Sequence, residues 1–531
     1  MRKFANGWLT LCVHLEAFRL APGAYLIAAK WWILRKRVRA QAQFAPLLSR
    51  TSRAYEWWIM RETTRLRRSD PVQGPPIFAL IYGTASAAEL EETLGSLAAE
   101  NVTTINIGLD AGEGIQRAIA AIDWSASVWL LPIAAGDSVA PGTAAAYRAA
   151  IEGHAQSVIF ADDDLLGRRG QRTAPHFKPD WNAEMHTHFD YLTGACLVRG
   201  ERKALEAVAN ERDWAATLIA RQAAAKGARH LPLVLHHRRS RPAPRVPAAA
   251  AAPRTAQPCV SVIIPTRNRA DLLRTCIEGL RATHYPDIEI IIIDNDSDDA
   301  ETLDYLFSLS TEGVKVLHHS GPFNYSAINN RAVAEARGPL LCLLNNDIEM
   351  ISPDWLAIMA AQAMRDEVGA VGAQLLYPDG RIQHAGVVIG VGNAAGHAHR
   401  FLNPQEEGYF YRHALPQFVS AVTAACLVVR RERFLMVGGL DESNFPIAFN
   451  DVDLCLKLNR RGWQSFYEPR AVLIHHESVS RGHDLDPVGA ARFAGELAAL
   501  KWIWKTDEVV DPYHHPQLSR ASEQFAIALQ H

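Results

Sequence analysis

Four segments in the first half of the chain recur, in the same order, in the second half. The matched segments share apolar runs and polar positions; for example, TGACLVRGERKAL is matched by TAACLVVRRERFL. One such match could arise by chance, but four in the same order are expected only from a duplication. The sequence therefore predicts two copies of one domain in tandem. The pairs are 130–146 with 341–357, 193–205 with 423–435, 211–221 with 449–460, and 231–241 with 470–481.

A segment rich in proline and alanine separates the two copies. It reads RPAPRVPAAAAAPRTAQP, which has too few large apolar side chains to build a core. At 531 residues the chain is long enough for two or three domains, each with its own core. We therefore expect a basic helical segment at 1–70, the first copy at 71–240, the linker at 241–258, the second copy at 259–485 and a helical tail at 486–531.

Apolar runs without alternation mark the strands of the second copy. VSVIIPT (260–266), IEIIIIDNDS (288–297) and LLCLLNND (340–347) are such runs, and helical patterns separate them. Strands of this kind are typical of an α/β domain with a mainly parallel sheet covered on both faces. Functional groups of such a sheet lie just beyond the carboxyl ends of the strands, which is where Asp294 and Asp347 fall.

The first seventy residues are strongly basic. They carry 14 Lys and Arg against 4 Asp and Glu, whereas the net charge of the whole chain is −2. Trp8, Leu11, Leu15 and Phe18 have helical spacing, which favours an amphipathic helix on an anionic membrane surface. A helical collar packed on the following domain is the alternative. We expect no nucleic-acid partner, because no known nucleic-acid-binding module accompanies the charge.

Apolar patterning and cysteine usage predict a cytoplasmic protein. No window has 18 uninterrupted apolar residues, and the N-terminus lacks the apolar core and cleavage site of a signal peptide. The seven cysteines show no CxxC spacing, and several lie within apolar runs, so we expect free thiols in a reducing compartment. The basic segment would allow peripheral contact with the inner face of the plasma membrane.

Six motifs follow one another in the second copy: PTRNR (265–269), IDNDSDD (293–299), FNYSAINNRAVAEARG (323–338), LLNNDIEM (343–350), NDVDLCLKL (450–458) and HHESVSRG (475–482). Together they resemble the family 2 glycosyltransferases of the inverting GT-A type, in particular the rhamnosyltransferase-like enzymes of bacterial O-antigen and surface-polysaccharide synthesis. The resemblance covers about 259–520 and includes DPYHHPQLS (511–519), similar to the DPYYNPNLS ending of bacterial members. The first copy is similar mainly through HFKPDWNAEM (176–185).

This resemblance implies two Rossmann-like GT-A domains and a metal-dependent, inverting transfer of a hexosyl or deoxyhexosyl group. The donor would be a UDP- or dTDP-linked sugar, and the acceptor a growing cell-surface glycan or lipid-linked glycan. Asp451 would be the general base, with Asp453 as the alternative. Asp347 and His475 would bind Mn²⁺ or Mg²⁺, with His476 as the alternative histidine.

The resemblance also assigns residues to the nucleotide sugar. Asp294 would bind the base or ribose, because a carboxylate accepts hydrogen bonds from N–H and hydroxyl donors. Arg481 would reach the diphosphate, since a guanidinium matches phosphate oxygens. The set comprises Pro265, Thr266, Arg267, Asp294, Asn295, Asn329, Asn346 and Arg481. The sugar and acceptor would depend on loops in 375–420, which carry no interpretable pattern.

The first copy lacks part of this machinery. It keeps Asp137, Asp213 and His236 at the matched positions, but FALIYGTAS (78–86) replaces the PTRNR turn, and no DNxS follows its second strand. We therefore expect a degenerate, mostly non-catalytic first domain. Two alternatives stay open: a bifunctional transferase with two active sites, and a non-catalytic glycan-binding scaffold. A nucleotidyltransferase would need a Gly-rich, basic loop after the first strand, which PTRNRADLL does not supply.

Overall fold

The computed structural model of the chain describes residues 2–66, 73–248, 257–476 and 487–529. Contacts divide the chain into two compact units. Unit 1 comprises 1–244, 512–519 and 526–531; unit 2 comprises 245–511 and 520–525. The division near residue 244 falls within the predicted linker, and the C-terminal segment contributes to both units.

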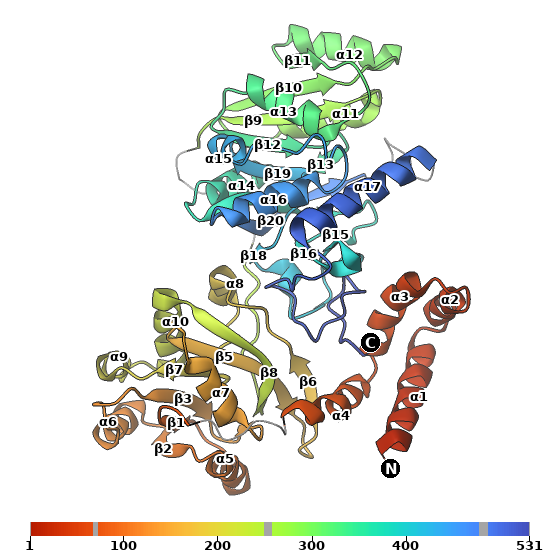
Figure 1. The fold of residues 1–531 in the computed structure, drawn as a ribbon. Helices are drawn as coiled ribbons and strands as arrows, with labels where there is room; N and C mark the ends of the chain where they lie inside the picture. Colours follow the sequence, from red (N-terminus) through yellow and green to blue (C-terminus); the bar gives the residue numbers. More distant parts are fainter. Residues whose placement is uncertain (1, 67–72, 249–256, 477–486, 530–531) are drawn as a thin grey trace. The chain divides into compact units, whose positions relative to one another are not determined.

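Unit 1 contains the N-terminal helices and one sheet (Figure 1). Its strands are β1 (Ile77–Tyr82), β2 (Thr103–Gly108), β3 (Trp129–Ala134), β4 (Ser138–Val139), β5 (Val158–Leu166), β6 (Arg172–His176), β7 (Cys196–Arg199) and β8 (Ala228–Arg238). Its helices are α1 (Arg2–Leu20), α2 (Pro22–Ile33), α3 (Arg37–Ser49), α4 (Ala54–Leu66), α5 (Ala87–Ala99), α6 (Ala111–Ala121), α7 (Thr143–Ile151), α8 (Ala183–His188), α9 (Arg202–Glu206) and α10 (Trp214–Lys226).

Unit 2 contains a larger sheet and a separate strand pair. Its strands are β9 (Val260–Thr266), β10 (Ile288–Asp294), β11 (Lys315–His318), β12 (Leu340–Leu344), β13 (Ile348–Met350), β14 (Val368–Leu376), β15 (Ile382–His384), β16 (Val387–Ile389), β17 (Ala395–His397), β18 (Gln417–Val419), β19 (Cys426–Arg430) and β20 (Gln464–His475). Its helices are α11 (Ala270–Arg281), α12 (Ala300–Thr311), α13 (Tyr325–Glu335), α14 (Trp355–Ala363), α15 (Arg431–Met436), α16 (Asn450–Arg460) and α17 (Pro487–Trp504), with short 3₁₀ helices η1 (Val391–Asn393) and η2 (Arg412–Ala414).

The two sheets share one strand order. In unit 1 the order is β2-β1-β3-β7-β5-β8-β4, and in unit 2 the equivalent strands run β10-β9-β12-β19-β14-β20-β13, with β11 added beside β10. The directions also agree: β1 is parallel to β2 and β3, and β9 is parallel to β10 and β12. This agreement supports the internal duplication that the sequence predicts.

Both sheets are mixed, but most strands on the main path of each run in one direction, which agrees with the prediction of a mainly parallel sheet; the reversed strands are β4 and β7 in unit 1 and β13 and β19 in unit 2. β7 runs antiparallel to β3 and β5, and β19 runs antiparallel to β12 and β14. An antiparallel strand at the centre of a sheet is buried on both faces, so its residues form the same continuous apolar run as a parallel strand. The α/β class is correct, but the apolar runs do not reveal strand direction.

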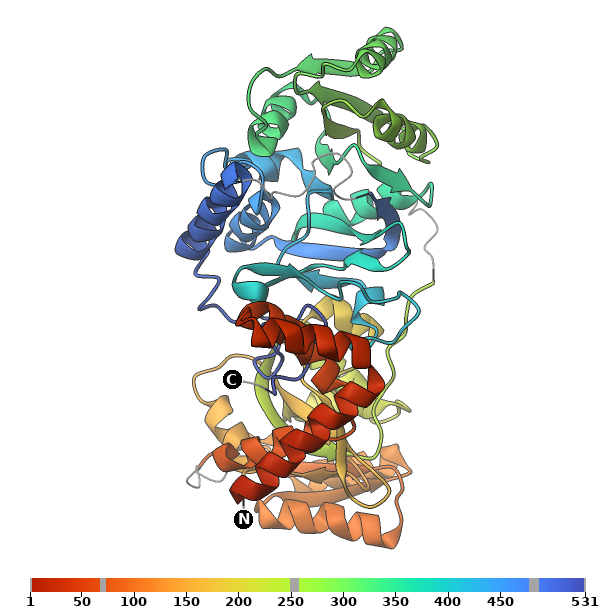
Figure 2. The same ribbon diagram turned by 90° about the vertical axis from the view of Figure 1, so that its right-hand side faces the viewer.

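Helices cover both faces of the unit 2 sheet (Figure 2). Every residue of β9 and β12 is buried, which requires a layer of side chains on each side. On one face, α13 and α16 pack in a core cluster with alternate residues of the strands, among them Ile263 and Leu341. On the other face, Cys426 of β19 contacts Met359 of α14. Because helices cover both faces of the sheet, its polar functional groups are expected at the strand ends.

The N-terminal segment is helical as predicted, and within unit 1 its helix α4 packs beside β5 and Phe177. The hydroxyl of Tyr55 donates to Asp164 of β5 at 2.6 Å, and the Trp58 ring lies 5.0 Å from that of Phe177. The collar interpretation therefore holds for α4. Within the described residues, no helix combines the length and the hydropathy that a membrane crossing needs.

The predicted helical tail at 486–531 is present only in its first part, as α17. Helix α17 ends at Trp504, and the structure contains no helix over the described residues 505–529. Pro512 and Pro516 each lack the backbone N–H that a helix interior needs, which accounts for part of this difference. Instead, 512–519 joins unit 1, where the Pro512 carbonyl accepts from the Asp180 N–H at 2.7 Å.

Candidate functional site

The carboxyl ends of β9, β10 and β12 are joined by hydrogen bonds. The Thr266 carbonyl at the end of β9 accepts from the Asn295 N–H at 2.9 Å. The Thr266 hydroxyl accepts from the side-chain amide of Asn346 at 3.1 Å. The structure therefore brings three of the predicted nucleotide-sugar residues together at one edge of the sheet, as the strand-end rule predicts.

Asp294 ends β10 and contacts two polar residues, Ser297 and His318. Its Oδ1 accepts from the Ser297 N–H at 3.2 Å and from the Ser297 hydroxyl at 2.5 Å, and its Oδ2 lies 3.5 Å from His318 Nδ1. Helix α12 is capped by another carboxylate, since Asp299 accepts from the Thr302 N–H. Asp294 is therefore not the helix cap and is held at the strand end by Ser297.

Asp347 and His475 form the centre of the candidate site. His475 ends β20 and lies opposite Ile348 of β13, so the strand register places it beside Asp347. His475 Nε2 lies 3.1 Å from Asp347 Oδ1 and 3.3 Å from the side-chain amide of Asn345. His476 faces elsewhere, because its Nε2 lies 2.9 Å from Glu349. Of the two histidines proposed from the sequence, His475 is the one beside Asp347.

The tautomer of His475 fits a metal ligand. Its Nδ1 lies 2.7 Å from Gln383 Oε1, which can only accept, so Nδ1 carries the proton and Nε2 presents a lone pair. The Asn345 amide donates toward the same Nε2. A lone pair and a carboxylate oxygen 3.1 Å apart repel unless a proton or a cation lies between them. These residues therefore fit a divalent ion, with diphosphate and water completing its shell.

Asp451 lines a cavity of ≈ 190 Å³ together with His475 and Asn345. Asp451 lies in the first turn of α16, where its Oδ2 accepts from the Ala424 N–H at 3.1 Å and its Oδ1 from the Val452 N–H at 2.8 Å. These two bonds fix the direction of the carboxylate. The other residues that line the cavity are Tyr325, Gln383, His397, Thr423, Ala424, Ala425, Ile447 and Asn450.

The alternative base, Asp453, has a structural role. It is buried, its carboxylate lies 2.8 Å from Lys457 Nζ, and it accepts from the Trp504 indole N–H at 2.9 Å. Phe449, just before α16, adopts a left-handed φ of 60°, a conformation that is unusual for an aromatic residue. The chain thus enters α16 by a constrained turn that places Asp451, and not Asp453, at the cavity.

Four predicted nucleotide-sugar residues remain. Pro265 is buried within β9, and Arg267 is exposed in the turn that follows. Asn329 is fully buried in α13, where its amide donates to the Tyr325 carbonyl. This position does not support a direct contact between Asn329 and a nucleotide. Arg481 lies outside the described residues.

Sequence reasoning missed Gln383 and His397. Both belong to 375–420, for which the sequence predicted loops that select the sugar and the acceptor; the structure contains the short strands β15, β16, β17 and β18 there. His397 Nδ1 lies 2.9 Å from the Gln383 carbonyl, so the two residues are positioned together. Asn345 lies in the LLNNDIEM motif, but no role was predicted for it. For Gln383, the available sequence signal was the polar RIQH stretch between glycine-containing turns.

The matched positions of unit 1 are arranged differently. Asp137 is buried, accepts from the Arg239 N–H at 2.7 Å and lies 3.8 Å from Arg238 Nε. Burial raises the pKa of Asp137 to about 6, against the opposing effect of Arg238. His236 Nε2 lies 2.6 Å from the Tyr147 hydroxyl, and Asp213 is exposed. A cationic arginine beside Asp137 disfavours a metal ion there, which agrees with a degenerate first domain.

Comparison with known proteins matches the second unit to a protein family. Residues 261–432 match the family described as Glycosyl transferase family 2. The chain is 39% identical over 418 residues to the uncharacterized protein y4gI of Sinorhizobium fredii, covering 70% of this chain and 46% of that protein. It is 34% identical over 407 residues to the O-antigen biosynthesis protein RfbC of Myxococcus xanthus, covering 68% and 31%.

A shorter alignment, 33% identical over 135 residues, matches the N-acetylglucosaminyl-diphospho-decaprenol L-rhamnosyltransferase of Mycobacterium tuberculosis and covers 24% of this chain and 44% of that protein. The chain spans less than half the length of each of these relatives. The family match includes β9, β10 and β12, which carry Thr266, Asp294 and Asp347 at or just beyond their ends. Through its second unit, the chain belongs to glycosyl transferase family 2.

Proposed function

We propose that the chain is a metal-dependent, inverting glycosyltransferase. It moves a hexosyl or deoxyhexosyl group from a nucleoside-diphosphate sugar to a hydroxyl group of a growing cell-surface glycan. The observation that carries the proposal is the cavity of ≈ 190 Å³, which Asp451 and His475 line together. A carboxylate that can take a proton thus faces the same space as a histidine–aspartate pair that fits a divalent cation.

The residues around the cavity have two different roles in the proposed reaction. Inversion requires attack on the face opposite the leaving group, so one carboxylate must take the proton of the acceptor hydroxyl. Asp451 suits this role because two backbone N–H groups orient it and each oxygen keeps a further lone pair. Bound at Asp347 and His475, Mn²⁺ or Mg²⁺ would supply positive charge to the departing diphosphate.

The donor and the acceptor are proposed from two kinds of support. The polar groups at the ends of β9, β10 and β12 offer hydrogen bonds to a nucleotide, for which we propose UDP or dTDP. The names of RfbC and of the mycobacterial rhamnosyltransferase point to O-antigen synthesis and to a lipid-linked acceptor. We therefore propose transfer to a glycan or lipid-linked glycan at the cytoplasmic face of the membrane, where the seven free thiols would stay reduced.

A donor panel tests the proposal. The purified chain is incubated with UDP-, dTDP- and GDP-linked sugars, with and without Mn²⁺ or Mg²⁺, and release of nucleoside diphosphate is measured. We expect metal-dependent release from one donor, raised further by a glycan acceptor. If no donor is turned over and calorimetry detects no donor binding, the proposal is wrong and the scaffold alternative is favoured.

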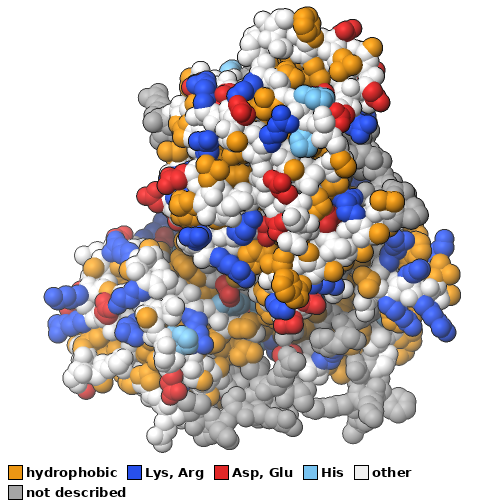
Figure 3. All heavy atoms as spheres, turned by 45° about the horizontal axis from the view of Figure 1, so that its top comes forward, with side chains coloured by type: hydrophobic (Ala, Val, Ile, Leu, Met, Phe, Trp, Pro, Cys, Tyr) orange, Lys and Arg blue, Asp and Glu red, His pale blue; other side chains and the backbone are white. Residues whose placement is uncertain are grey.

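We also propose that α1 and α2 contact an anionic membrane surface. On α1, Leu9, Val13 and Ala17 are buried, whereas Trp8 and Leu11 are 65% and 49% exposed. Leu15, Phe18, Leu26, Ile27 and Ile33 are exposed as well. Exposed Lys and Arg side chains lie beside this apolar stripe, and Figure 3 shows both kinds together at its right-hand edge. Apolar side chains beside cations are the combination that binds an anionic lipid surface.

Vesicle binding tests this contact. The double variant Leu11→Ser/Leu15→Ser should bind phosphatidylglycerol vesicles about 10²-fold more weakly than the unchanged chain, because two leucines leave the membrane interior. Co-sedimentation measures the affinity. Leu94→Ser on α5, which removes a leucine that is 39% exposed, is the matched control and should bind normally. Equal binding of all three proteins, or equal binding to neutral vesicles, would contradict the proposal.

A further inference from the structure

His397 lies on the wall of the cavity of ≈ 190 Å³, together with Asp451 and His475, but the reaction proposed above gives it no role. It ends β17, a short strand that pairs with β16 apart from the larger sheet of unit 2. Its side chain is partly exposed. A partly exposed histidine on the same wall as the proposed base and metal ligand can contact the molecule that enters the cavity.

The neutral form of His397 has a defined tautomer. Its Nδ1 lies 2.9 Å from the backbone carbonyl of Gln383, which can only accept, so Nδ1 carries the proton. Nε2 then presents a lone pair, and within the described residues no group donates a hydrogen bond to it. Such a lone pair accepts from hydroxyl groups, which are the main hydrogen-bond donors of a sugar.

Other polar side chains on the cavity wall use their donors within the protein. The Tyr325 hydroxyl donates to the Ala424 carbonyl at 3.0 Å. The Asn450 amide donates to the Ile447 carbonyl at 2.8 Å. His397 differs from these neighbours, because its bond to the protein leaves Nε2 available to a substrate.

A second histidine supports the ring of His397. The ring of His384 packs against it, with centroids 5.3 Å apart and planes at 79°. His384 is itself fixed, since its Nδ1 lies 2.9 Å from the Ala373 carbonyl and its Nε2 accepts from the Thr423 N–H at 3.2 Å. Burial lowers the pKa of His384 to about 3, so it stays neutral at physiological pH. His397 therefore packs on a fixed, uncharged neighbour that limits the rotation of its ring.

The C-terminal segment 520–525, which belongs to unit 2, holds the backbone of the β16–β17 hairpin. Glu523 Oε1 accepts from the His397 N–H at 3.1 Å. The Arg520 carbonyl accepts from the Gly392 N–H in the turn at 2.8 Å. These bonds fix the hairpin at its turn and at the end of β17. A hydrogen-bonding group on such a supported element is placed more precisely than one on a free loop.

We propose that His397 Nε2 accepts a hydrogen bond from a hydroxyl group of the sugar in the cavity, and that this bond selects sugars that carry a hydroxyl at that position. The inference rests on the proposed sugar transfer. The hydroxyl belongs either to the transferred sugar or to the acceptor, and both present the same chemistry to an imidazole. A site built to bond a hydroxyl disfavours the analogue that lacks it, because a polar group of the site is then left unpaired.

Two substitutions separate this role from a structural one. His397→Asn keeps an N–H donor near the position of Nδ1, for the Gln383 carbonyl, and loses Nε2. His397→Gln places an amide oxygen near the position of Nε2 and loses the donor at Nδ1. We expect His397→Asn to lower kcat/KM about 10-fold, the effect of one hydrogen bond, and His397→Gln to recover most of that loss. If His397 only positioned Gln383, the order of the two variants would be reversed.

Two assays locate the hydroxyl. Both use UDP- and dTDP-linked sugars with Mn²⁺; one measures hydrolysis of the donor in water, and the other measures transfer to methyl glycosides of glucose, galactose and N-acetylglucosamine. A loss in hydrolysis assigns the hydroxyl to the transferred sugar, whereas a raised KM for the glycoside alone assigns it to the acceptor. The matching deoxy sugar should slow the unchanged chain about 10-fold and make it insensitive to His397→Asn.

His284→Asn is the matched control. His284 is exposed in unit 2, its Nδ1 also has a partner, Asp354 at 3.1 Å, and it does not line the cavity, so kcat/KM should stay unchanged. If His397→Asn does not fold, His397→Leu replaces it, since leucine lacks both nitrogens and only His397→Gln restores an acceptor.

Equal kcat/KM of His397→Asn and the unchanged chain in both assays, or a larger loss in His397→Gln than in His397→Asn, would overturn the inference. Either result leaves the proposed function standing, because the unchanged chain still releases nucleoside diphosphate. Absence of release from every donor in every protein would instead refute the proposed function, and the inference with it.

Discussion

Asp451→Asn should reduce the kcat of sugar transfer by about 10²–10⁴-fold, the usual contribution of a general base. The amide has nearly the shape of the carboxylate, but it cannot accept the acceptor proton at neutral pH. Its oxygen can keep the bond from the Ala424 N–H, so α16 and the cavity should stay intact. Donor binding, measured by calorimetry, should change little, because Asp451 acts on the acceptor. A large fall in kcat with an unchanged donor Kd would assign Asp451 to the chemical step.

Asp453→Asn is the matched control, two residues further along the same helix. Asp453 bonds Lys457 and Trp504 within unit 2, so its loss should lower Tm while the kcat of the folded fraction stays close to that of the unchanged chain. Asp213→Asn in unit 1 should change neither quantity, since Asp213 is exposed and its side chain caps no helix. If Asp213→Asn removes activity and Asp451→Asn does not, the active site lies in unit 1, and the assignment of the two copies must be exchanged.

The residues at the strand ends could be predicted from the sequence because the apolar runs that locate them are local features. Thr266, Asp294 and Asp347 each follow an uninterrupted apolar run, and such runs form buried strands wherever they pair. The motif resemblance then gave them roles. The preference for Asp451 over Asp453 rested on the motif resemblance alone, because their different surroundings depend on the left-handed turn at Phe449 and on the distant Trp504. A sequence pattern carries no information on such tertiary partners.

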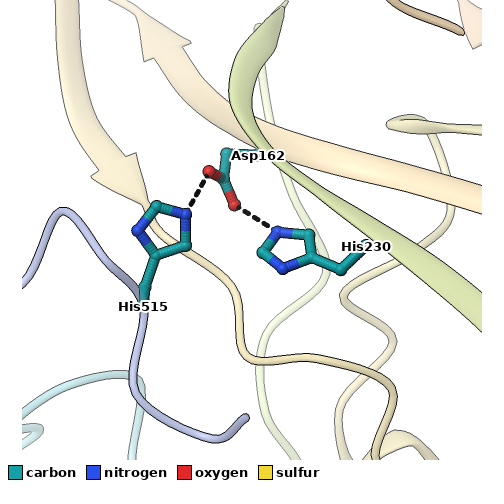
Figure 4. Close-up of side chains that lie close together, drawn as sticks. All are labelled: Asp162, His230 and His515. Atoms are coloured by element: carbon teal, nitrogen blue, oxygen red, sulfur yellow. Dashed lines mark hydrogen bonds and ion pairs between the residues drawn. The ribbon is translucent and has the colours of Figure 1, made fainter. Parts of the chain in front are cut away.

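Groups from distant segments could not be predicted for the same reason. Gln383 orients His475 although 92 residues separate them, and the register of β14 with β15 and β20 creates that contact. His515 reaches Asp162 only because the chain returns to unit 1 after α17 (Figure 4). The antiparallel direction of β19 was hidden because both faces of the strand are buried. Local sequence patterns predict where helices and strands begin and end. Strand pairing, and the path of segments such as 512–519, decide which of these residues come into contact.

Asp347→Ala should abolish metal-dependent release of nucleoside diphosphate, with a fall in kcat/KM of about 10³-fold or more. A divalent ion that stabilises a departing diphosphate contributes several kcal/mol to the transition state, and each 1.36 kcal/mol is tenfold in rate. Asp347 supplies the one carboxylate that lies against His475 Nε2 among the described residues, so its loss leaves the ion a single neutral protein ligand. Release measured against Mn²⁺ concentration should stay at background at every concentration.

Gln383→Ala gives the graded control that separates metal binding from general damage to the site. Gln383 accepts from His475 Nδ1 at 2.7 Å, and losing such an outer partner costs about 10–100-fold in metal affinity. The variant should therefore need about 10–100-fold more Mn²⁺ for half-maximal rate and regain most of its kcat at saturation. Asp347→Ala should not be rescued, because its ligand is absent and not merely misoriented. If excess Mn²⁺ rescued both variants equally, or neither variant lost activity, Asp347 and His475 would not form the metal site.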